Sequence, residues 1–426
     1  MSLCKQGCAS LRHHIIVIGG GVVGLFCAYF LLRRQFEVTV LAGRDPRRAA
    51  SWGNAGYLAA GFGPSHPPPK SLLTLARWAL SPSSHVRASL RFMIGEIMPG
   101  GWLWEFLRGG RQGEGRPLGL LRQLCVRGVE LFKAIVRREQ LELELREEGL
   151  LEVFRDEKKL TAAKLGAQEL RRLGARIREL SAEECLNMEP CLSREITGGL
   201  LYEEDAWANP QRTLLELRGL VTRSGGELLE EEAVLLDVNA RRIERVRTER
   251  RRLRAESVVL AAGARSSALL RALNLRPLVA AARGYGIICT PSEERLARPV
   301  MCGDLRIATS QLGDGRLKAT ASFELDSEGS PGRPGRHEQI AKEAGLYLPP
   351  FTRARIEERW VGYRPCTPDG FPLVGRSTKI ENLLMATGHC RLGLTTAAVT
   401  GELLAKALAG EEDELLRALS PSRYGL

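Results

Sequence analysis

The chain has 426 residues, of which 44% are hydrophobic and 26% are charged. This length and balance are typical of a globular enzyme with one large or two smaller domains, and they exclude fibrous and intrinsically disordered classes. The net charge of +12 comes mainly from arginine interleaved with glutamate. Even the basic run at residues 241–254 alternates with apolar residues as paired strands do, so we expect no nucleic-acid partner.

The first predicted elements lie in an uncharged run at residues 15–32, which has the length of a membrane helix. Three consecutive glycines interrupt this run after a β-branched stretch, which indicates a strand, a tight turn and a helix instead. The pattern predicts a strand at 15–18, a helix at 22–34 and a strand at 37–41. Together these elements form a βαβ unit.

Within this unit Gly19, Gly21 and Gly24 have the spacing G-x-G-x-x-G. In a dinucleotide-binding turn the first glycine allows the turn, the second lets the backbone approach a pyrophosphate, and the third packs the helix on the strand. The helix N-terminus adds free N–H groups and the positive end of its dipole. We therefore predict a dinucleotide site here.

The acidic residue that normally ends the second strand and holds the ribose is missing, because that position is Ala42. Asp45 can reach back if the loop folds over, or the backbone alone can hold the adenosine. Arg44 would suit the 2′-phosphate of NADP, so a nicotinamide enzyme stays open as an alternative at this point.

Small residues dominate the next stretch, Ser51 to Tyr57, and would let a flat ring lie against the backbone. Residues 71–145 are mostly helical in period and include an apolar segment with Trp102, Trp104 and Phe106. That segment is interpreted as core or a dimer surface, with a peripheral membrane contact as the alternative.

The middle of the chain mixes short strands with two helices. We predict strands at 150–154, 199–202, 233–238, 242–248, 252–253 and 257–260, and helices at 157–173 and 209–223. The last strand enters Ala261, Ala262 and Gly263, whose small side chains suit close approach to a cofactor or a tight turn.

The C-terminal quarter repeats the arrangement of strand, glycine-rich turn and helix. A strand at 383–386 precedes the segment from Thr387 to Thr395, and a helix is predicted at 396–408. The N-terminus of that helix can stabilise negative charge.

Five collinear motifs now support a family resemblance over nearly the whole chain: GGGVVG, SWGNAG, VVLAAGARS, GYRPCTPDGFPLVG and ATGHCRLGLTTAAVTGELLA. The chain resembles the FAD-dependent D-amino-acid oxidase superfamily, and within it the branch of D-amino-acid dehydrogenase and dye-linked L-proline dehydrogenase. The resemblance implies an α/β fold, α+β overall, with a Rossmann-like FAD-binding domain in three pieces, 12–75, 207–275 and 362–426. It also implies a mixed-sheet substrate domain from 76–206 and 276–361.

The resemblance further implies which residues contact FAD: Gly19, Gly21, Val23, Gly24, Ser51, Asn54, Gly56, Val234, Ala262, Gly263, Arg391, Leu392, Gly393, Leu394 and Thr395. Arg364, in Gly-x-Arg-Pro, is implied to bind the substrate carboxylate. Tyr285 is the second pocket candidate and His389 the third, although His389 is expected to act in packing rather than in acid–base catalysis.

The ten cysteines include no CxxC pair of the zinc or thioredoxin type, so we expect no metal site. Cys366 and Cys390 lie in the two C-terminal motifs and can approach each other or the flavin, but we expect buried, inert thiols. The expected compartment is the cytoplasm, with association at the inner face of a membrane as the alternative.

The function expected from these features is oxidation of the C–N bond of an amino acid, with hydride transfer to flavin N5 and electrons passed to a quinone or dye. Proline is the preferred substrate, because the overall similarity favours that branch and no second charged group is evident for a side chain. The alternatives are a D-amino-acid dehydrogenase, an oxidase that uses oxygen, an NADP-dependent reductase, and a cofactor-bearing subunit without activity. A homo-oligomer is compatible with all of them.

Overall fold

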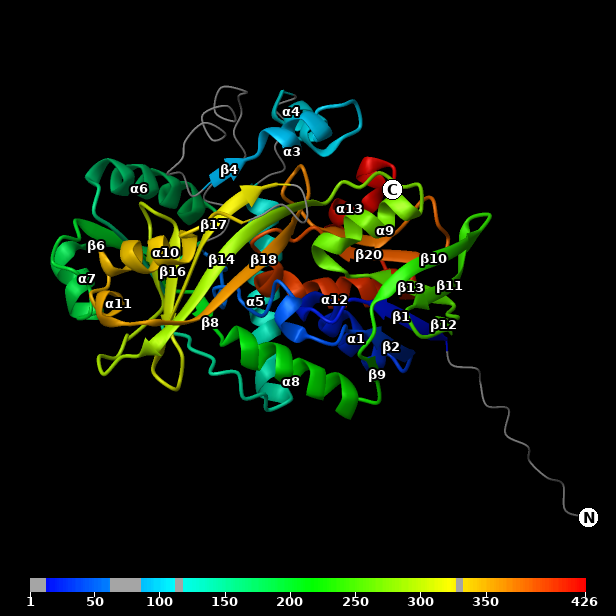
Figure 1. The fold of residues 1–426 in the computed structure, drawn as a ribbon, viewed down its shortest axis with the longest axis horizontal. Coiled ribbons are helices and arrows are strands. Elements are labelled where there is room, and N and C mark those ends of the chain that lie inside the picture. Colours follow the sequence, from blue (N-terminus) through cyan, green and yellow to red (C-terminus); the bar gives the residue numbers. More distant parts are fainter. Residues whose placement is uncertain (1–12, 62–85, 112–117, 327–331) are drawn as a thin grey trace, which may run out of the picture.

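Two large β-sheets lie next to each other along the long axis of the molecule (Figure 1). The structure is a computed structural model and describes residues 13–61, 86–111, 118–326 and 332–426. One sheet has six strands and the other has nine. The chain therefore has the expected α/β architecture, with a mixed second sheet.

The six-stranded sheet has the order β19-β20-β13-β1-β2-β9 and is parallel except for β19, which pairs antiparallel with β20. Its strands come from three distant parts of the sequence. Their bounds are His14–Ile18 for β1, Glu37–Leu41 for β2, Glu227–Leu229 for β9, Ser257–Leu260 for β13, Leu373–Arg376 for β19 and Leu383–Thr387 for β20. Because β1, β2, β9, β13 and β20 are parallel, the loops after them emerge at one common edge.

Helices cover one face of this sheet. They are α1 (Val22–Arg33), α8 (Pro210–Arg223) and α12 (Gly393–Ala409), with α5 (Leu118–Arg138) packed on α12. Buried apolar residues of all four share one core with β1 and β2, which explains why α1 is apolar almost all round. The predicted strand, turn and helix at residues 15–32 are confirmed, and the described part of the chain contains no helix that meets the length and hydropathy of a membrane span.

A small antiparallel sheet covers the opposite face. It consists of β10 (Ala233–Asn239), β11 (Arg242–Thr248) and β12 (Arg252–Leu253), next to α9 (Ser266–Ala272). Ile243 and Val246 of β11 are buried in a core with β1 and β13. The arginines of the basic run alternate with these core residues, as the strand prediction requires.

The nine-stranded sheet has the order β18-β14-β17-β16-β15-β5-β7-β6, with the short β4 paired to β17. Two pairs, β15 with β5 and β17 with β4, are parallel and the others are antiparallel. The bounds are Val86–Ala88 for β4, Leu150–Phe154 for β5, Ile177–Ser181 for β6, Gly198–Tyr202 for β7, Ala280–Pro291 for β14, Val300–Cys302 for β15, Ile307–Gln311 for β16, Arg316–Leu325 for β17 and Ile356–Cys366 for β18.

Short helices pack around this second sheet: α6 (Glu157–Arg172), α7 (Ala182–Met188), α10 (Arg336–Gly345) and α11 (Pro350–Arg353). The remaining elements are α3 (Leu90–Glu96), α4 (Trp102–Arg111), α13 (Glu414–Leu419), and the pair β3 (Tyr57–Leu58) and β8 (Ala206–Trp207). The segment boundary expected between residues 361 and 362 falls inside β18, and α5, from the predicted substrate domain, packs with α12. The division into two domains stays a prediction.

Candidate active site

A cavity of about 1480 Å³ is lined both by the loops at the common edge of the six-stranded sheet and by one face of the nine-stranded sheet. The sheet-edge lining comprises residues 18–23 after β1, 41–43 after β2, 261–265 after β13 and 389–395 before and within α12. Ligands of open parallel sheets bind in such a crevice, outside the carboxyl ends of the strands. The fold therefore brings the separate glycine-rich motifs to one place.

The three glycines of the first turn are needed for different reasons. Gly19 has a φ of +125°, and a side chain there would overlap the carbonyl of Ala261. A side chain at Gly24 would overlap the carbonyl of Gly19, so this residue serves the packing of α1 on β1 and does not line the cavity. At Gly21, in contrast, the nearest protein atom to an added Cβ is Ser51 Oγ at 3.5 Å, and the residue faces the cavity. Only an occupant of the cavity requires a glycine at position 21.

Two helix N-termini face this cavity without a side-chain cap. The N-cap of α1 is Gly21 and that of α12 is Leu392, and neither makes a side-chain capping bond. Val22 N donates to Ser51 Oγ at 3.3 Å. The other N–H groups of the first turns are available to an anion or a polar ring edge.

The predicted small-residue stretch forms part of the wall. Asn54 Oδ1 accepts from Gly56 N at 2.7 Å, and Asn54 Nδ2 donates to Ser51 O at 3.1 Å, so Asn54 shapes its own loop. Gly56 has a φ of +82° and lies against Trp207. Ser51, Asn54 and Gly56 all line the cavity.

The opposite wall is one face of the nine-stranded sheet. Residues that pair directly across neighbouring strands share one face of the sheet. One such row crosses six strands in register and consists of Trp360, Gly286, Thr320, Ala308, Met301 and Glu152. All but Gly286 line the cavity. A side chain at Gly284, two residues before Gly286 on the same face, would collide with the guanidinium of Arg364. The glycines of β14 thus leave space for long side chains to lie flat across the sheet.

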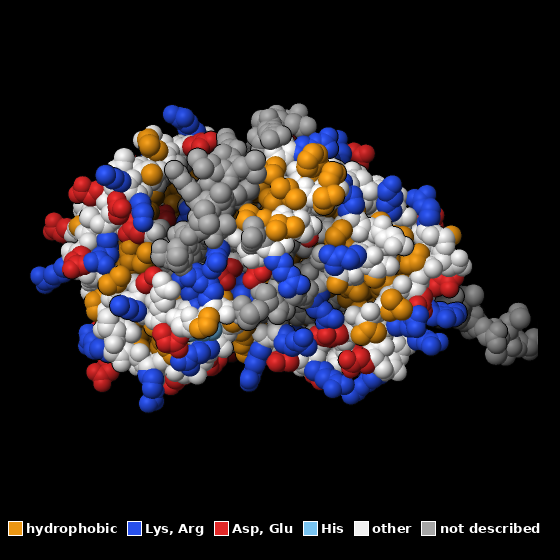
Figure 2. Space-filling model, turned by 45° about the horizontal axis from the view of Figure 1, so that its top comes forward, with side chains coloured by type: hydrophobic (Ala, Val, Ile, Leu, Met, Phe, Trp, Pro, Cys, Tyr) orange, Lys and Arg blue, Asp and Glu red, His pale blue; other side chains and the backbone are white. Residues whose placement is uncertain are grey.

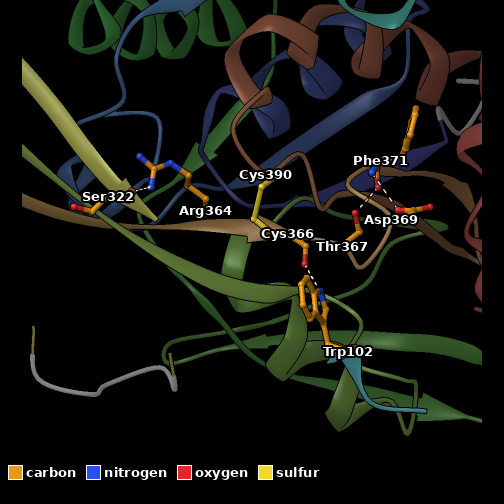
Figure 3. Close-up of a disulfide and its surroundings, with 8 residues drawn as sticks. All are labelled: Trp102, Ser322, Arg364, Cys366, Thr367, Asp369, Phe371 and Cys390. Atoms are coloured by element: carbon orange, nitrogen blue, oxygen red, sulfur yellow. Dashed lines mark hydrogen bonds between the residues drawn. A yellow bond between two sulfur atoms is a disulfide. The ribbon is translucent and has the colours of Figure 1, made fainter. Parts of the chain in front are cut away.

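Arg364 crosses β14 and is held at the wall by the backbone of β17. Its Nη1 donates to the carbonyl of Ser322 at 2.8 Å (Figure 3). Ser322 has a φ of +73°, an unusual conformation for a residue that is not glycine. Burial, together with the charge of Arg391, lowers the pKa of Arg364 to about 10, so the side chain stays charged at neutral pH. Within the described residues no Asp or Glu oxygen lies within 4.0 Å of its guanidinium nitrogens.

Two charged residues on the wall formed by the nine-stranded sheet, Glu152 and Arg306, also face the cavity and were not among the predicted site residues. Glu152, on β5, accepts from the hydroxyl of Tyr202 at 2.9 Å, and burial raises its pKa to about 7. Arg306 follows β15, and burial lowers its pKa while the charge of Glu152 acts in the opposite direction. Neither residue belongs to a motif, because only the pairing of distant strands brings them to the wall.

The predicted site residues can now be placed. Fifteen of them line the cavity: Gly19, Gly21, Val23, Ser51, Asn54, Gly56, Ala262, Gly263, Arg364, His389, Arg391, Leu392, Gly393, Leu394 and Thr395. His389 is buried, and its Nε2 lies 3.0 Å from Thr400 Oγ1. Burial lowers its pKa to about 3, which makes the imidazole neutral at physiological pH.

Besides Gly24, which packs α1 on β1, two predicted contacts need correction. Tyr285 lies on β14 between Gly284 and Gly286, so its side chain points to the opposite face of the sheet, where the hydroxyl donates to Glu324 Oε2 at 3.0 Å. It is 1% exposed and does not line the cavity. The side chain of Val234 is 52% exposed, and the neighbouring Glu232 and Ala233 line the cavity in its place.

Comparison with known proteins decides the family. A family model described as "DAO: FAD dependent oxidoreductase" matches residues 14–407. The chain belongs to this FAD-dependent oxidoreductase family. The cofactor of the family is FAD, so the NADP alternative is wrong. Consistently, Arg44 lies outside the cavity lining, with its Nη2 4.0 Å from Glu249 Oε2.

Relatives and solved structures resemble the chain over almost its full length. D-amino acid dehydrogenases of Vibrio vulnificus (strain YJ016) and Neisseria meningitidis serogroup C (strain FAM18) are 28% and 29% identical; each match covers 96% of this chain and 99% of the relative. A glycine oxidase structure from Geobacillus kaustophilus gives a TM-score of 0.74 at 20% identity, covering 96% of this chain and 98% of the other. An L-proline dehydrogenase structure from P. horikoshii gives 0.72 at 18% identity, covering 97% and 98%.

The residues at the sheet edge fit an FAD molecule. The turn after β1 presents backbone without side chains at Gly21, both uncapped helix N-termini face the same cavity, and the strands of the opposite wall leave room beside Arg364. A dinucleotide needs this combination of a close backbone and N–H donors for its pyrophosphate. The DAO-type fold thus explains why motifs so far apart in sequence share one cavity.

Cys366 and Cys390 form a disulfide in this structure, so the expectation of two inert thiols is wrong (Figure 3). Their Cα atoms lie 4.3 Å apart, at an isolated bridge that pairs Cys366 with His389. Trp102 Nε1 donates to the carbonyl of Cys366 at 2.7 Å. The bond therefore joins the end of β18, which carries Arg364, to the loop that carries Arg391.

Replacing Cys366 and Cys390 by serine should lower the free energy of unfolding by about 3 kcal/mol, the loop-closure value for a separation of 24 residues. The measurement is thermal or denaturant unfolding with and without reductant. Reductant should destabilise the wild type and leave the double variant unchanged. Equal numbers of titratable thiols in denatured wild type before and after reduction would show that the bond does not form.

Proposed function

We propose that the protein oxidises the C–N bond of an amino acid and passes the electrons to a quinone or dye. The observation that supports this best is Arg364, a charged guanidinium fixed by one backbone carbonyl and without an acidic partner among the described residues at the wall of the cavity. A planar guanidinium binds a carboxylate through two parallel hydrogen bonds. Its position suits the carboxylate of a substrate.

The cofactor-binding residues have distinct proposed tasks. Gly21 and the first turn of α1 hold the pyrophosphate, with Gly19 and Gly24 shaping that turn and Val23 beside it. Ser51, Asn54 and Gly56, together with Ala262 and Gly263, line the path of the nucleotide. Residues 391–395 bring the N-terminus of α12 toward the ring system, where its N–H groups favour negative charge.

FAD, when bound, would supply the two-electron acceptor for oxidation at the carbon next to the carboxylate. The chain contributes orientation: Arg364 holds the carboxylate, and the disulfide keeps the segments of Arg364 and Arg391 together. His389 is neutral and hydrogen-bonded, which supports packing rather than proton transfer. The oxidised substrate leaves as an imine, which water hydrolyses or which cyclises.

The electron acceptor is the finer part of this proposal. We favour a quinone or dye over oxygen because relatives named D-amino acid dehydrogenase are similar over nearly the whole chain. Ile94, Ile97, Met98 and Trp104 are exposed on and between α3 and α4, and Figure 2 shows hydrophobic side chains on the face that carries these helices. We place the enzyme in the cytoplasm. An exposed apolar surface of this kind supports peripheral contact with the inner face of a membrane or with a second copy of the chain.

Proline remains the first substrate to test, since an L-proline dehydrogenase has the same fold. The second reason for proline, the lack of another charged group, does not hold, because Arg306 and Glu152 face the cavity. Arg306 has no acidic oxygen within 4.0 Å in the described structure. It supports a second candidate, an amino acid with two carboxylates.

One substrate panel tests both candidates. Proline, alanine and aspartate of both configurations are mixed with the enzyme without oxygen, and loss of the oxidised-flavin absorbance is followed with a dye as the final acceptor. If Arg306 binds a second carboxylate, Arg306→Gln raises KM for aspartate about tenfold or more and leaves KM for proline or alanine unchanged. An equal rise of KM for all substrates would show that Arg306 does not select the substrate. Bleaching of the flavin by proline alone would support the first candidate.

A further inference from the structure

The end of β2 lacks the acid that usually holds the adenosine ribose, and a carboxylate from a neighbouring segment lies close by. Ala42 follows the last residue of β2, so the usual position carries a methyl group. Asp45, three residues further, accepts from Arg47 N at 2.9 Å and caps a short helix at Pro46–Arg48. Its carboxylate is therefore already engaged by the backbone of its own turn.

Strand β9 brings a second acidic segment to the same point. It runs parallel to β2, with Leu41 opposite Leu229, so the chain after β9 leaves at the same edge. Ala42 N donates to Leu229 O at 2.9 Å and Gly43 N donates to Glu231 O at 3.1 Å. These bonds hold the segment after β9 directly beside the residues that follow β2.

Of the three glutamates in this segment, Glu230, Glu231 and Glu232, only Glu232 faces the cavity. Glu230 Oε1 lies 3.7 Å from Arg218 Nη2. Glu231 is buried, and its Oε2 accepts a hydrogen bond from the hydroxyl of Thr248. Its Oε1 lies 2.9 Å from Arg251 Nε. Glu232 lines the cavity, and its Oε1 lies 3.3 Å from the position that a Cβ on Gly43 would take. The carboxylate thus lies beside Gly43, the residue that follows Ala42.

Two arginines hold this carboxylate in place. Arg265 donates to Oε2 of Glu232, and Arg48 Nη1 lies 3.5 Å from Oε1. Both arginines also line the cavity. A carboxylate accepts about four hydrogen bonds, so these two contacts leave sites for a further donor.

We infer that Glu232 accepts hydrogen bonds from the ribose hydroxyls of the adenosine half of FAD, in place of the acid that Ala42 replaces. The carboxylate comes from the neighbouring strand but reaches the same edge of the sheet. The inference concerns the cofactor and does not depend on which amino acid is oxidised. Arg48 and Arg265 act as positioning residues for the carboxylate.

The test compares FAD with an analogue that lacks both hydroxyls on the adenosine ribose. The flavin is removed from the purified protein, and each compound is titrated back while its fluorescence is recorded. Wild type should bind the analogue about 10- to 100-fold more weakly than FAD, the range expected for hydrogen bonds to a charged group. Glu232→Gln should lower the affinity for FAD by a similar factor. The affinity of this variant for the analogue should be only slightly lower than its affinity for FAD.

Three results would overturn the inference. Equal affinity of the wild type for FAD and the analogue means that no group holds the hydroxyls. An unchanged preference for FAD over the analogue in Glu232→Gln means that Glu232 is not that group. Loss of the preference in Asp45→Asn instead assigns the ribose to Asp45. Glu249→Gln, at an exposed glutamate paired with Arg44, is the matched control and should bind both compounds as the wild type does.

Discussion

Arg364→Ala should keep its flavin and lose substrate affinity. We expect KM to rise and kcat/KM to fall by about 30- to 10³-fold, because removing a charged, paired hydrogen-bond donor costs roughly 2 to 4 kcal/mol of transition-state binding. The cofactor should remain because Arg364 belongs to the nine-stranded sheet and donates to the carbonyl of Ser322, and not to the first glycine-rich turn. Steady-state kinetics and the flavin-to-protein absorbance ratio measure the two parts separately.

The matched control is Arg359→Ala on the same strand. Arg359 is exposed and pairs with Glu338 at 2.8 Å, away from the cavity lining, so KM should not change. Arg364→Lys keeps the charge without the planar fork and should recover only part of the lost affinity. An unchanged KM in Arg364→Ala would remove this residue from the substrate site and with it the main support for an amino-acid substrate.

Gly21→Val should give a folded protein without flavin. An added Cβ meets no protein atom closer than 3.5 Å, and the φ of −78° at Gly21 suits any residue, so the fold should tolerate the change. A valine side chain nevertheless fills the space through which the turn approaches the pyrophosphate. We expect loss of the yellow colour with an unchanged circular dichroism spectrum.

Gly166→Val serves as the control for this substitution. Gly166 lies within α6, outside the cavity lining, and an added Cβ there has no neighbour within 4 Å. This variant should stay yellow, and valine has a slightly higher helix propensity than the glycine that it replaces. A fully yellow Gly21→Val protein would contradict the assignment of this turn to the phosphates.

Local patterns were sufficient to predict four of the six strands of the first sheet, β1, β2, β13 and β20, together with its glycine-rich turns, but not β9 or β19. Gly24 lies against the carbonyl of Gly19 in the same βαβ unit, Gly19 lies against the carbonyl of Ala261 after β13, and Gly21 faces the cavity, so the G-x-G-x-x-G spacing carries the information. The strand at Ser257–Leu260 likewise ends in small residues that lie beside Gly19. The predicted strands from 233 to 260 also agree with β10 to β13 to within a residue.

The opposite wall could not be predicted in the same way. Glu152 and Arg306 face the cavity only because β5, β15 and β16 pair across the sheet, and their neighbours in sequence give no motif. Tyr285 was misplaced because side-chain direction in a strand alternates, and a shift of one residue changes the face. The Cys366–Cys390 bond depends on a contact across 24 residues that spacing alone does not reveal.

Glu232 shows the same limit at the cofactor edge. The absence of an acid at Ala42 is evident in the sequence, but its replacement lies almost two hundred residues later, after β9. Only the parallel pairing of β2 with β9 brings the two positions together. Sequence patterns therefore identified the missing group, and the sheet topology identified its substitute.

The most direct test of the account is the absorbance spectrum of the purified protein, recorded without oxygen before and after addition of amino acids. We predict the spectrum of bound, oxidised flavin, and bleaching by at least one amino acid that is much slower in Arg364→Ala at the same concentration. A colourless protein that FAD does not reconstitute would contradict the cofactor site. A yellow protein that no amino acid bleaches, but dithionite does, would contradict the proposed reaction.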